Sequence, residues 1–212
     1  MLTRPHAPSP ASPRACPRRQ ALGSTVHPVC PQPVAPRLRQ WLSAPGSLTA
    51  RLRLLGTVRV AVIDQGRRQL WPQERRALGC SVGHVREVVL LVDECPAVWA
   101  RSSVPVRAVK GPWRAIRGLG TRPLAELLFT HRAVRRGPLQ ALHMRAHGPA
   151  GAHMNKQWQQ LIQAQETVAA GGRRRLPVPN WARHSLFHHH GQPLQVLEAF
   201  APWVATRSCR HG

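Results

Sequence analysis

Three charged side chains in this sequence stand beside apolar residues, where a charge is costly to bury. Glu198 lies within the apolar run 194–200, and Arg86 precedes the apolar run 88–92. Arg101 falls in the segment predicted to pair with the Arg86 strand. An arginine fork binds carboxylates through parallel hydrogen bonds, each worth roughly 1.5–3 kcal/mol. We therefore predict that Arg86 and Arg101 bind a small anion, with Glu198 available to bind the ligand or to move a proton.

A purely structural explanation of Glu198 stays open. A carboxylate on a sheet face needs a cation or donors to offset its desolvation, and the strand alone favours a salt bridge to a strand arginine. The other seven acids give weaker signals. Glu87 and Glu126 adjoin apolar runs and could pair with neighbouring arginines. The remaining five fall in turns or polar stretches and are predicted to be solvated: Asp64, Glu74, Asp93, Glu94 and Glu166.

Metal binding and nucleophilic catalysis have little support. In the histidine run 188–190, adjacent strand residues point to opposite faces, so at most two could bind one ion. Cys80 and Cys95 have no base motif around them, and the five cysteines form no Cys-x-x-Cys pair. No glycine-rich phosphate loop follows a predicted strand. We expect no cofactor and no metal.

The apolar periodicity predicts the sheet that would position these side chains. Strands are expected over 57–64, 82–93, 97–106, 131–145, 181–190 and 194–203, with turns at 93–96 and 191–193. Short helices are expected from 37, from 48 after a Ser47 cap, near 113–119, and from Pro123. Long antiparallel strands with short helices between them indicate an α+β fold, a single domain with helices packed on an antiparallel β-sheet.

Composition sets the boundaries of this domain. Residues 1–36 are proline- and arginine-rich without an acid, which indicates a disordered basic extension or a misassigned start. An organellar transit peptide is disfavoured because prolines would break its amphipathic helix. The domain is predicted over 37–204, with a tail over 205–212. Residues 146–179, with a polar helical piece over 155–169, are interpreted as an insertion or flap outside the core.

The net charge of +23 would give salt-dependent, non-specific affinity for nucleic acids. The arginines are spread through the strands, without an aromatic RNA-binding motif or a recognition helix, so no specific nucleic-acid partner is expected. No apolar run approaches the roughly 18–20 residues of a membrane span, and no secretory signal is evident. We expect a cytoplasmic monomer.

Six segments in collinear order resemble the chorismate lyase family. The first holds LS at 42–43, SLT at 47–49 and Gly56. The others are VREVVLL at 85–91, WARSSVPV at 99–106, LGTRPL with LLFT at 119–130, WARHS at 181–185, and GQPL with EAFAP at 191–202. The resemblance covers roughly 37–144 and 181–203. Each segment is weak alone, and their shared order makes the resemblance strong.

The resemblance implies an enzyme that eliminates pyruvate from chorismate to give 4-hydroxybenzoate, the first committed step toward ubiquinone. It implies that the ligand lies inside the fold beneath helical flaps. By position, the substrate-binding residues are Arg86, Arg101, Leu124, Leu48 and Glu198, with Leu48 standing where the family has a methionine. Arg86 and Glu198 would be catalytic, although hydrogen transfer within the substrate would leave Glu198 a positioning role only.

A non-catalytic ligand-binding module of the same fold is the alternative, because fold alone does not fix function. Such modules occur as effector domains of bacterial transcription regulators, behind a winged-helix domain. Residues 1–36 are too short and too proline-rich to supply that domain.

Overall fold

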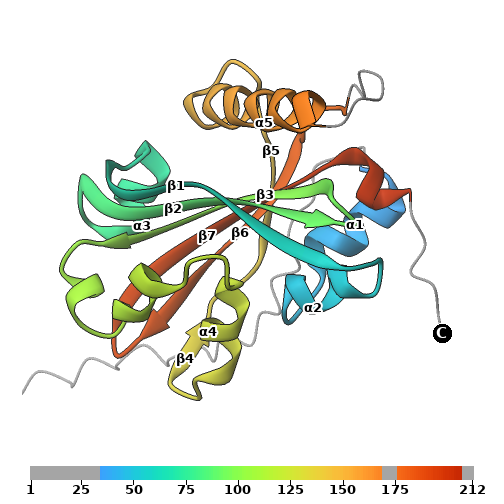
Figure 1. Ribbon diagram of the computed structural model, residues 1–212. Coiled ribbons are helices and arrows are strands. Elements are labelled where there is room, and N and C mark those ends of the chain that lie inside the picture. The colour runs from blue at the N-terminus through green and yellow to red at the C-terminus, as the bar shows by residue number, and fades with distance from the viewer. Residues whose placement is uncertain (1–33, 169–175, 207–212) are drawn as a thin grey trace, which may run out of the picture.

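The structure is a computed structural model that describes residues 34–168 and 176–206. Within them, one antiparallel sheet carries helices on both faces, which is the predicted α+β architecture (Figure 1). The predicted extension lies outside the described residues up to residue 33, and the predicted tail lies outside them from residue 207. None of the described helices is long and apolar enough to cross a membrane.

The strands of the sheet follow the order β1-β2-β3-β7-β6-β4, and β5 also pairs with β6. Their bounds are β1 (Val58–Gln69), β2 (Val82–Val92), β3 (Cys95–Pro105), β4 (Val134–Arg136), β5 (Gln140–His143), β6 (Trp181–His189) and β7 (Gln192–Phe200). The single strand predicted over 131–145 is therefore two short strands. Pro138 lies between them, and proline has no N–H to donate to a strand ladder.

Positive φ angles define the two hairpin turns that set the register of the sheet. Asp93 and Glu94 join β2 to β3 with φ of 48° and 62°, and His190 and Gly191 join β6 to β7 with φ of 47° and 73°. Two-residue turns with two positive φ angles match the right-handed twist of the paired strands. Both turns are shorter than predicted, because Cys95 and the segment after Gly191 already belong to strands.

Within residues 34–168 and 176–206, five α-helices lie around the sheet. They are α1 (Pro36–Ser43), α2 (Leu48–Arg53), α3 (Pro72–Leu78), α4 (Leu124–Thr130) and α5 (Pro149–Val168), with 3-10 turns η1 (Ala108–Lys110), η2 (Arg114–Gly118) and η3 (Pro202–Ala205). Ser47 caps α2 as predicted, since its Oγ accepts from the Ala50 N–H at 3.1 Å. Helix α3 was not predicted, although it begins at Pro72 and ends at left-handed Gly79.

The sheet has two faces with different cover. Arg86 and Glu198 project from one face, here called the cavity face, which α2 and α4 cover. Glu87 and Arg101 project from the other, here called the opposite face, which α3 and α5 cover. In Figure 1, α5 lies on the far side of the sheet from α2 and α4. Charged side chains at neighbouring positions of one strand, such as Arg86 and Glu87, therefore lie on different faces of the sheet.

Helix α5 is part of the core, so the interpretation of 146–179 as lying outside the core is wrong for this helix. Met154, Trp158 and Ile162 recur at helical spacing, are buried, and belong to the main hydrophobic cluster. Gln157 on the same helix accepts a hydrogen bond from Trp99 Nε1 at 2.7 Å. The helical piece predicted near 155–169 is confirmed, but it covers the opposite face rather than the cavity.

Candidate active site

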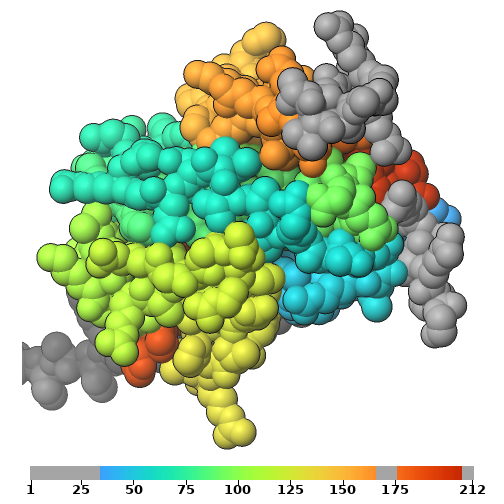
Figure 2. Space-filling model, in the orientation of Figure 1, coloured from blue at the N-terminus to red at the C-terminus, as the bar shows by residue number. Residues whose placement is uncertain are grey.

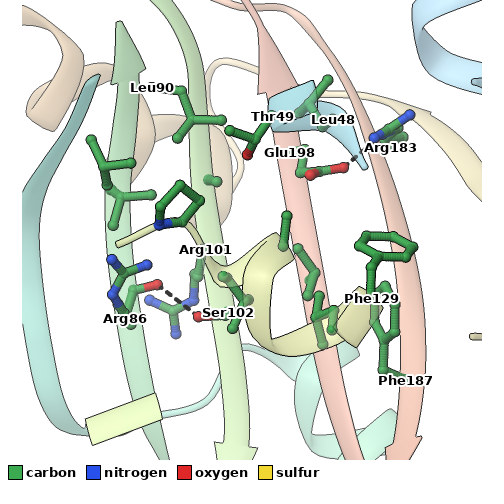
Figure 3. A pocket seen from close by; sticks show the side chains of 18 of the residues that line it. Leu48, Thr49, Arg86, Leu90, Arg101, Ser102, Phe129, Arg183, Phe187 and Glu198 are labelled. Atoms are coloured by element: carbon green, nitrogen blue, oxygen red, sulfur yellow. Dashed lines mark hydrogen bonds and ion pairs between the residues drawn. The ribbon is translucent and has the colours of Figure 1, made fainter. Parts of the chain in front are cut away.

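A cavity lies between the cavity face of the sheet and the helices α2 and α4 (Figure 3). Its floor consists of two rows across the sheet, Arg86–Ser102–Val196 and Val88–Ala100–Glu198–Arg183. Its cover comes from 46–49 and 123–129. In Figure 2, residues of β1 and α2 and of the 105–140 segment lie side by side over this region and largely hide β6 and β7.

All five predicted site residues border this one cavity, although they come from five separate elements of the chain. They are Leu48, Arg86, Arg101, Leu124 and Glu198. Leu48 and Leu124 occupy the first positions of α2 and α4, so both helices present their N-terminal turns to the cavity. The apolar remainder of the lining includes Phe129 and Phe187. The cavity thus combines apolar walls with a few charged groups.

Arg86 is a buried cation without a carboxylate partner among the described residues. Its side chain is 2% exposed, and its Nη2 donates to the carbonyl oxygens of Gly120 and Arg122 at 2.8 and 3.1 Å. Its Nε has no hydrogen-bond partner in the described part of the chain. Burial removes water from the guanidinium and lowers the pKa of Arg86, yet a guanidinium stays protonated in a protein. This environment suits an incoming anion.

Arg101 is among the residues that line the cavity, but its guanidinium does not join Arg86 on the cavity face. In the β2–β3 ladder Arg86 pairs with Ser102 while Arg101 pairs with Glu87, so the two arginines project from opposite faces. The Arg101 guanidinium contacts Glu87 at 2.5 Å and both oxygens of Glu74 at 2.7 and 2.9 Å. The prediction that the two arginines converge on one anion is wrong, because a one-residue offset reverses the face.

Glu198 forms a salt bridge to a strand arginine. This is the structural explanation that the sequence left open for a carboxylate in an apolar strand. Arg183 lies opposite Glu198 in the β6–β7 ladder, and its Nε donates to Glu198 Oε2 at 2.6 Å. The Nη1 of Arg183 donates to the carbonyl oxygens of Trp41 and Ala44. Glu198 still borders the cavity, and its Oε1 makes no hydrogen bond with the described residues. Figure 3 shows Arg86 and Glu198 on different sides of the cavity.

The sequence did not identify two further arginines that border the cavity, Arg183 and Arg136. Arg136 ends the short strand β4, and its Nε donates to Ser185 Oγ at 3.1 Å. Its pKa is lowered by burial and by the nearby charge of Arg183, and is partly restored by Glu198. The hairpin register could have revealed Arg183 once the turn was placed at His190 and Gly191. Nothing in the sequence distinguishes Arg136 from the many other arginines.

The surroundings of Glu74 on α3 also differ from expectation. Glu74 was predicted to be solvated, but it is 3% exposed and accepts from Arg101, from Ser103 Oγ and from the Trp71 N–H. Burial by itself would raise the pKa of Glu87, but hydrogen bonds from His153, Gln157 and Arg101 outweigh it and lower the pKa.

Of the other acids, the expected pairing of Glu87 with an arginine is confirmed. Asp93 and Glu94 are exposed, as expected. Asp64 lies within β1 and pairs with Arg68. Glu126 lies 4.0 Å from Arg53. The side chain of Glu166 falls outside the described part of the chain.

Among the described residues, the histidines and Cys80 form no second candidate centre. In the part of the chain that the structure describes, no three His, Cys, Asp or Glu side chains gather where they could hold a metal ion. His189 Nδ1 lies 3.1 Å from the Pro112 carbonyl oxygen. Burial raises the pKa of the Cys80 thiol, against the opposing charge of Arg107, so this thiol is not activated as a nucleophile.

Known structures resemble the fold weakly. The regulator PhnF from Mycobacterium smegmatis has a TM-score of 0.43 at 13% identity, over 75% of this chain and 65% of that chain. The C-terminal domain of the histidine utilization repressor from Pseudomonas syringae pv. tomato has a TM-score of 0.41 at 10% identity, over 74% and 97%.

Several proteins have a much higher sequence identity to this chain. A protein of Albidiferax ferrireducens named "Probable chorismate pyruvate-lyase" is 41% identical over 182 residues, covering 81% of this chain and 88% of the relative. A protein of Azoarcus sp. (strain BH72) with the same name is 40% identical over 179 residues, covering 82% and 88%. The sequence model of the family described as chorismate lyase matches residues 31–209. This protein therefore belongs to the chorismate lyase family.

Proposed function

We propose that this protein eliminates pyruvate from chorismate to give 4-hydroxybenzoate, the first committed step toward ubiquinone. The observation that carries the proposal is the placement of Arg86 and Glu198 at one cavity. Arg86 is a buried cation without a carboxylate partner among the described residues, and Glu198 is a carboxylate fixed by Arg183. Such a cavity suits a small ligand that has an anionic end and a hydroxyl end.

The proposed reaction needs groups that position the substrate more than groups that supply electrons. Chorismate is a dianion with one ring carboxylate and one carboxylate on its enolpyruvyl ether. The ether C–O bond breaks, and the enolpyruvyl oxygen keeps the bonding electrons. The neighbouring ring carbon, which carries the hydroxyl, loses its hydrogen, and the ring becomes aromatic. Enolpyruvate takes up a proton as it becomes pyruvate, so atoms and charges balance without an oxidant.

In this proposal Arg86 binds the ring carboxylate. Its Nη2 already donates to two backbone carbonyls, so the guanidinium is held in place before the ligand arrives. The N–H of Leu124 belongs to the first turn of α4, where backbone N–H groups lack partners within the helix. Leu48 and Phe129 supply apolar contacts to the ring. Fixing the reactive conformer in this way lowers the entropic part of the barrier.

Glu198 binds the ring hydroxyl or accepts a proton during the elimination. Because Oε2 is engaged by Arg183, Oε1 is the atom that faces the ligand. An ionised carboxylate only accepts hydrogen bonds, which fits a hydroxyl donor on the substrate. If the hydrogen instead moves within the substrate to the departing enolpyruvyl group, Glu198 acts by orienting the hydroxyl.

The test uses purified protein and chorismate without added metal or nucleotide. We expect 4-hydroxybenzoate, followed by absorbance, and pyruvate, followed by a coupled assay, to appear in equal amounts. Arg86→Ala should abolish both signals. Binding of chorismate without turnover would contradict the proposal in favour of a non-catalytic ligand-binding module. The absence of both binding and turnover would contradict both functions.

A further inference from the structure

Four arginines border the cavity, and their charges are compensated unequally. Arg101 is neutralised by Glu74 and Glu87 on the opposite face, and Arg183 is neutralised by Glu198. Arg86 and Arg136 have no carboxylate within ion-pair distance in the described part of the chain. The cavity therefore offers two uncompensated positive charges, which matches a ligand with two negative charges better than a ligand with one.

Arg136 is fixed at the β4 edge of the cavity. Its Nε donates to Ser185 Oγ at 3.1 Å, and its Nη1 lies 3.3 Å from the Gly46 carbonyl oxygen. Its guanidinium carbon lies 5.3 Å from the centre of the Phe187 ring, which orients the plane of the group. The remaining nitrogen, Nη2, makes no hydrogen bond within the described residues. The guanidinium is thus positioned and keeps donor capacity for a ligand.

The two uncompensated arginines approach the cavity from different ends of one row of the sheet. Arg86 pairs with Ser102, Ser102 with Val196, and Val196 with Ser185, to which Arg136 is bonded. Three steps between neighbouring strands span about 14 Å of backbone. Both arginines line the cavity, one toward each end of this row, an arrangement that suits a small ligand with two separate carboxylates.

We propose that Arg136 binds the enolpyruvyl carboxylate of chorismate while Arg86 binds the ring carboxylate. This assignment rests on the proposed function and adds a second anion site to it. Glu198 neighbours Arg136 and receives the ring hydroxyl. On the substrate, the hydroxyl and the enolpyruvyl ether are on adjacent ring carbons. The neighbouring positions of Glu198 and Arg136 in the cavity match this arrangement. Burial lowers the pKa of both arginines, in agreement with charges that an anion would stabilise.

This assignment makes substrate and product differ in their dependence on Arg136. Chorismate carries both carboxylates, whereas 4-hydroxybenzoate keeps only the carboxylate bound by Arg86. Arg136 therefore holds the group that leaves as pyruvate and stabilises charge on the departing enolpyruvyl oxygen. Product affinity should be insensitive to Arg136.

The experiment compares Arg136→Gln, Arg136→Lys and Arg86→Gln, with Arg135→Gln as the matched control on the exposed side of the same strand. Calorimetry measures the Kd of 4-hydroxybenzoate, and steady-state kinetics measures the kcat and KM of chorismate. We expect Arg136→Gln to raise KM roughly tenfold or more, the effect of losing one charged hydrogen bond, and to change the product Kd less than twofold. Arg86→Gln should weaken both ligands, Arg136→Lys should restore part of the loss, and Arg135→Gln should match the wild type.

Equal weakening of substrate and product by Arg136→Gln would overturn the assignment, since a merely structural role of Arg136 affects both ligands alike. An unchanged KM in Arg136→Gln would also overturn it. If the wild type binds both ligands but does not convert chorismate, the proposed function fails. In that case the Kd of chorismate is measured by calorimetry as well, and its change relative to that of the 4-hydroxybenzoate Kd in Arg136→Gln still decides the role of Arg136.

Discussion

Arg183 and Glu198 lie directly opposite each other on β6 and β7, and Arg183 Nε donates to Glu198 Oε2 at 2.6 Å. Arg183 is 1% exposed, and its other bonds to the carbonyls of Trp41 and Ala44 tie the pair to the end of α1. One oxygen of the cavity carboxylate is therefore fixed by the fold, and the other makes no hydrogen bond with the described residues. Under the proposed function, the carboxylate that forms this structural ion pair also contacts the substrate.

Glu198→Gln should separate these roles. The amide keeps the shape of the side chain but loses the negative charge and the capacity to take up a proton. If Glu198 moves a proton, we expect kcat for chorismate to fall roughly 100-fold or more, the usual contribution of acid–base catalysis. Glu94→Gln, at an exposed acid, is the control and should keep full turnover. Near-full turnover of Glu198→Gln would leave Glu198 with an orienting role only.

Arg183→Met should act mainly on folding. The change leaves the Glu198 carboxylate without its cation and removes the hydrogen bonds that Arg183 donates to two backbone carbonyls at the end of α1. Breaking a buried ion pair by removing one partner costs about 3–5 kcal/mol. Urea denaturation should show this loss in the free energy of unfolding, while Arg67→Met at an exposed position of β1 should stay near wild type. Equal stability of the two variants would argue against a structural role for the pair.

Arg101→Lys should reduce stability rather than ligand affinity. Lysine keeps the charge but cannot form the two-pronged contact with Glu74 while it also reaches Glu87. A loss of about 2 kcal/mol corresponds to a fall in Tm of roughly 4–8 °C for a chain of this size. The Kd of 4-hydroxybenzoate should change less than about twofold, whereas Arg86→Lys should weaken it by at least roughly tenfold. A larger loss of affinity in Arg101→Lys than in Arg86→Lys would mean that Arg101 contacts the ligand.

The sequence predicts those elements in which a local pattern is decisive. The apolar alternation in β2, β3, β6 and β7 and the Ser47 cap of α2 need no information from distant residues. The face of the sheet from which Arg101 projects depends instead on the register across the β2–β3 hairpin. The turn of this hairpin was predicted too long, so the register was not fixed. Counting seven residues back from His190 and seven on from Gly191 places Arg183 opposite Glu198, so a correct turn would have revealed this pair.

Other features depend on packing that no local pattern encodes. Helix α3 has the sequence PQERRAL, which looks solvated, yet Glu74 is buried because Arg101 approaches it from β3. Arg136 reaches the cavity from a three-residue edge strand in an arginine-rich chain. Helix α5 is rich in glutamine, and its few apolar residues are buried only because the opposite face of the sheet lies against them. All three features depend on contacts between elements that are far apart in the sequence, so no local pattern predicts them.

Stability should fall in acid through Glu87. Its folded-state pKa is lowered below the ordinary value of 4.5, so its contribution is fully present above that value and is lost as the pH falls through the lower, folded-state pKa. The free energy of unfolding of the wild type should therefore drop between roughly pH 5 and 3, the acid range in which carboxylates titrate. Glu87→Gln should show a flatter profile, and Glu126→Gln, at an exposed acid, should follow the wild type. Parallel profiles for all three proteins would contradict the assignment.

Trp158→Ala tests whether α5 is a core element or a flap. The side chain of Trp158 is fully buried with Met154 against the opposite face of the sheet, and truncating a buried tryptophan costs about 3–5 kcal/mol. We expect that loss in urea denaturation, with Gln160→Ala at an exposed position of the same helix close to wild type. Because α5 covers the face away from the cavity, the KM for chorismate of the folded variant should stay within about twofold of wild type, less than the effect of one lost charged hydrogen bond. A stable variant with an altered KM would instead make α5 a mobile cover that reaches the cavity.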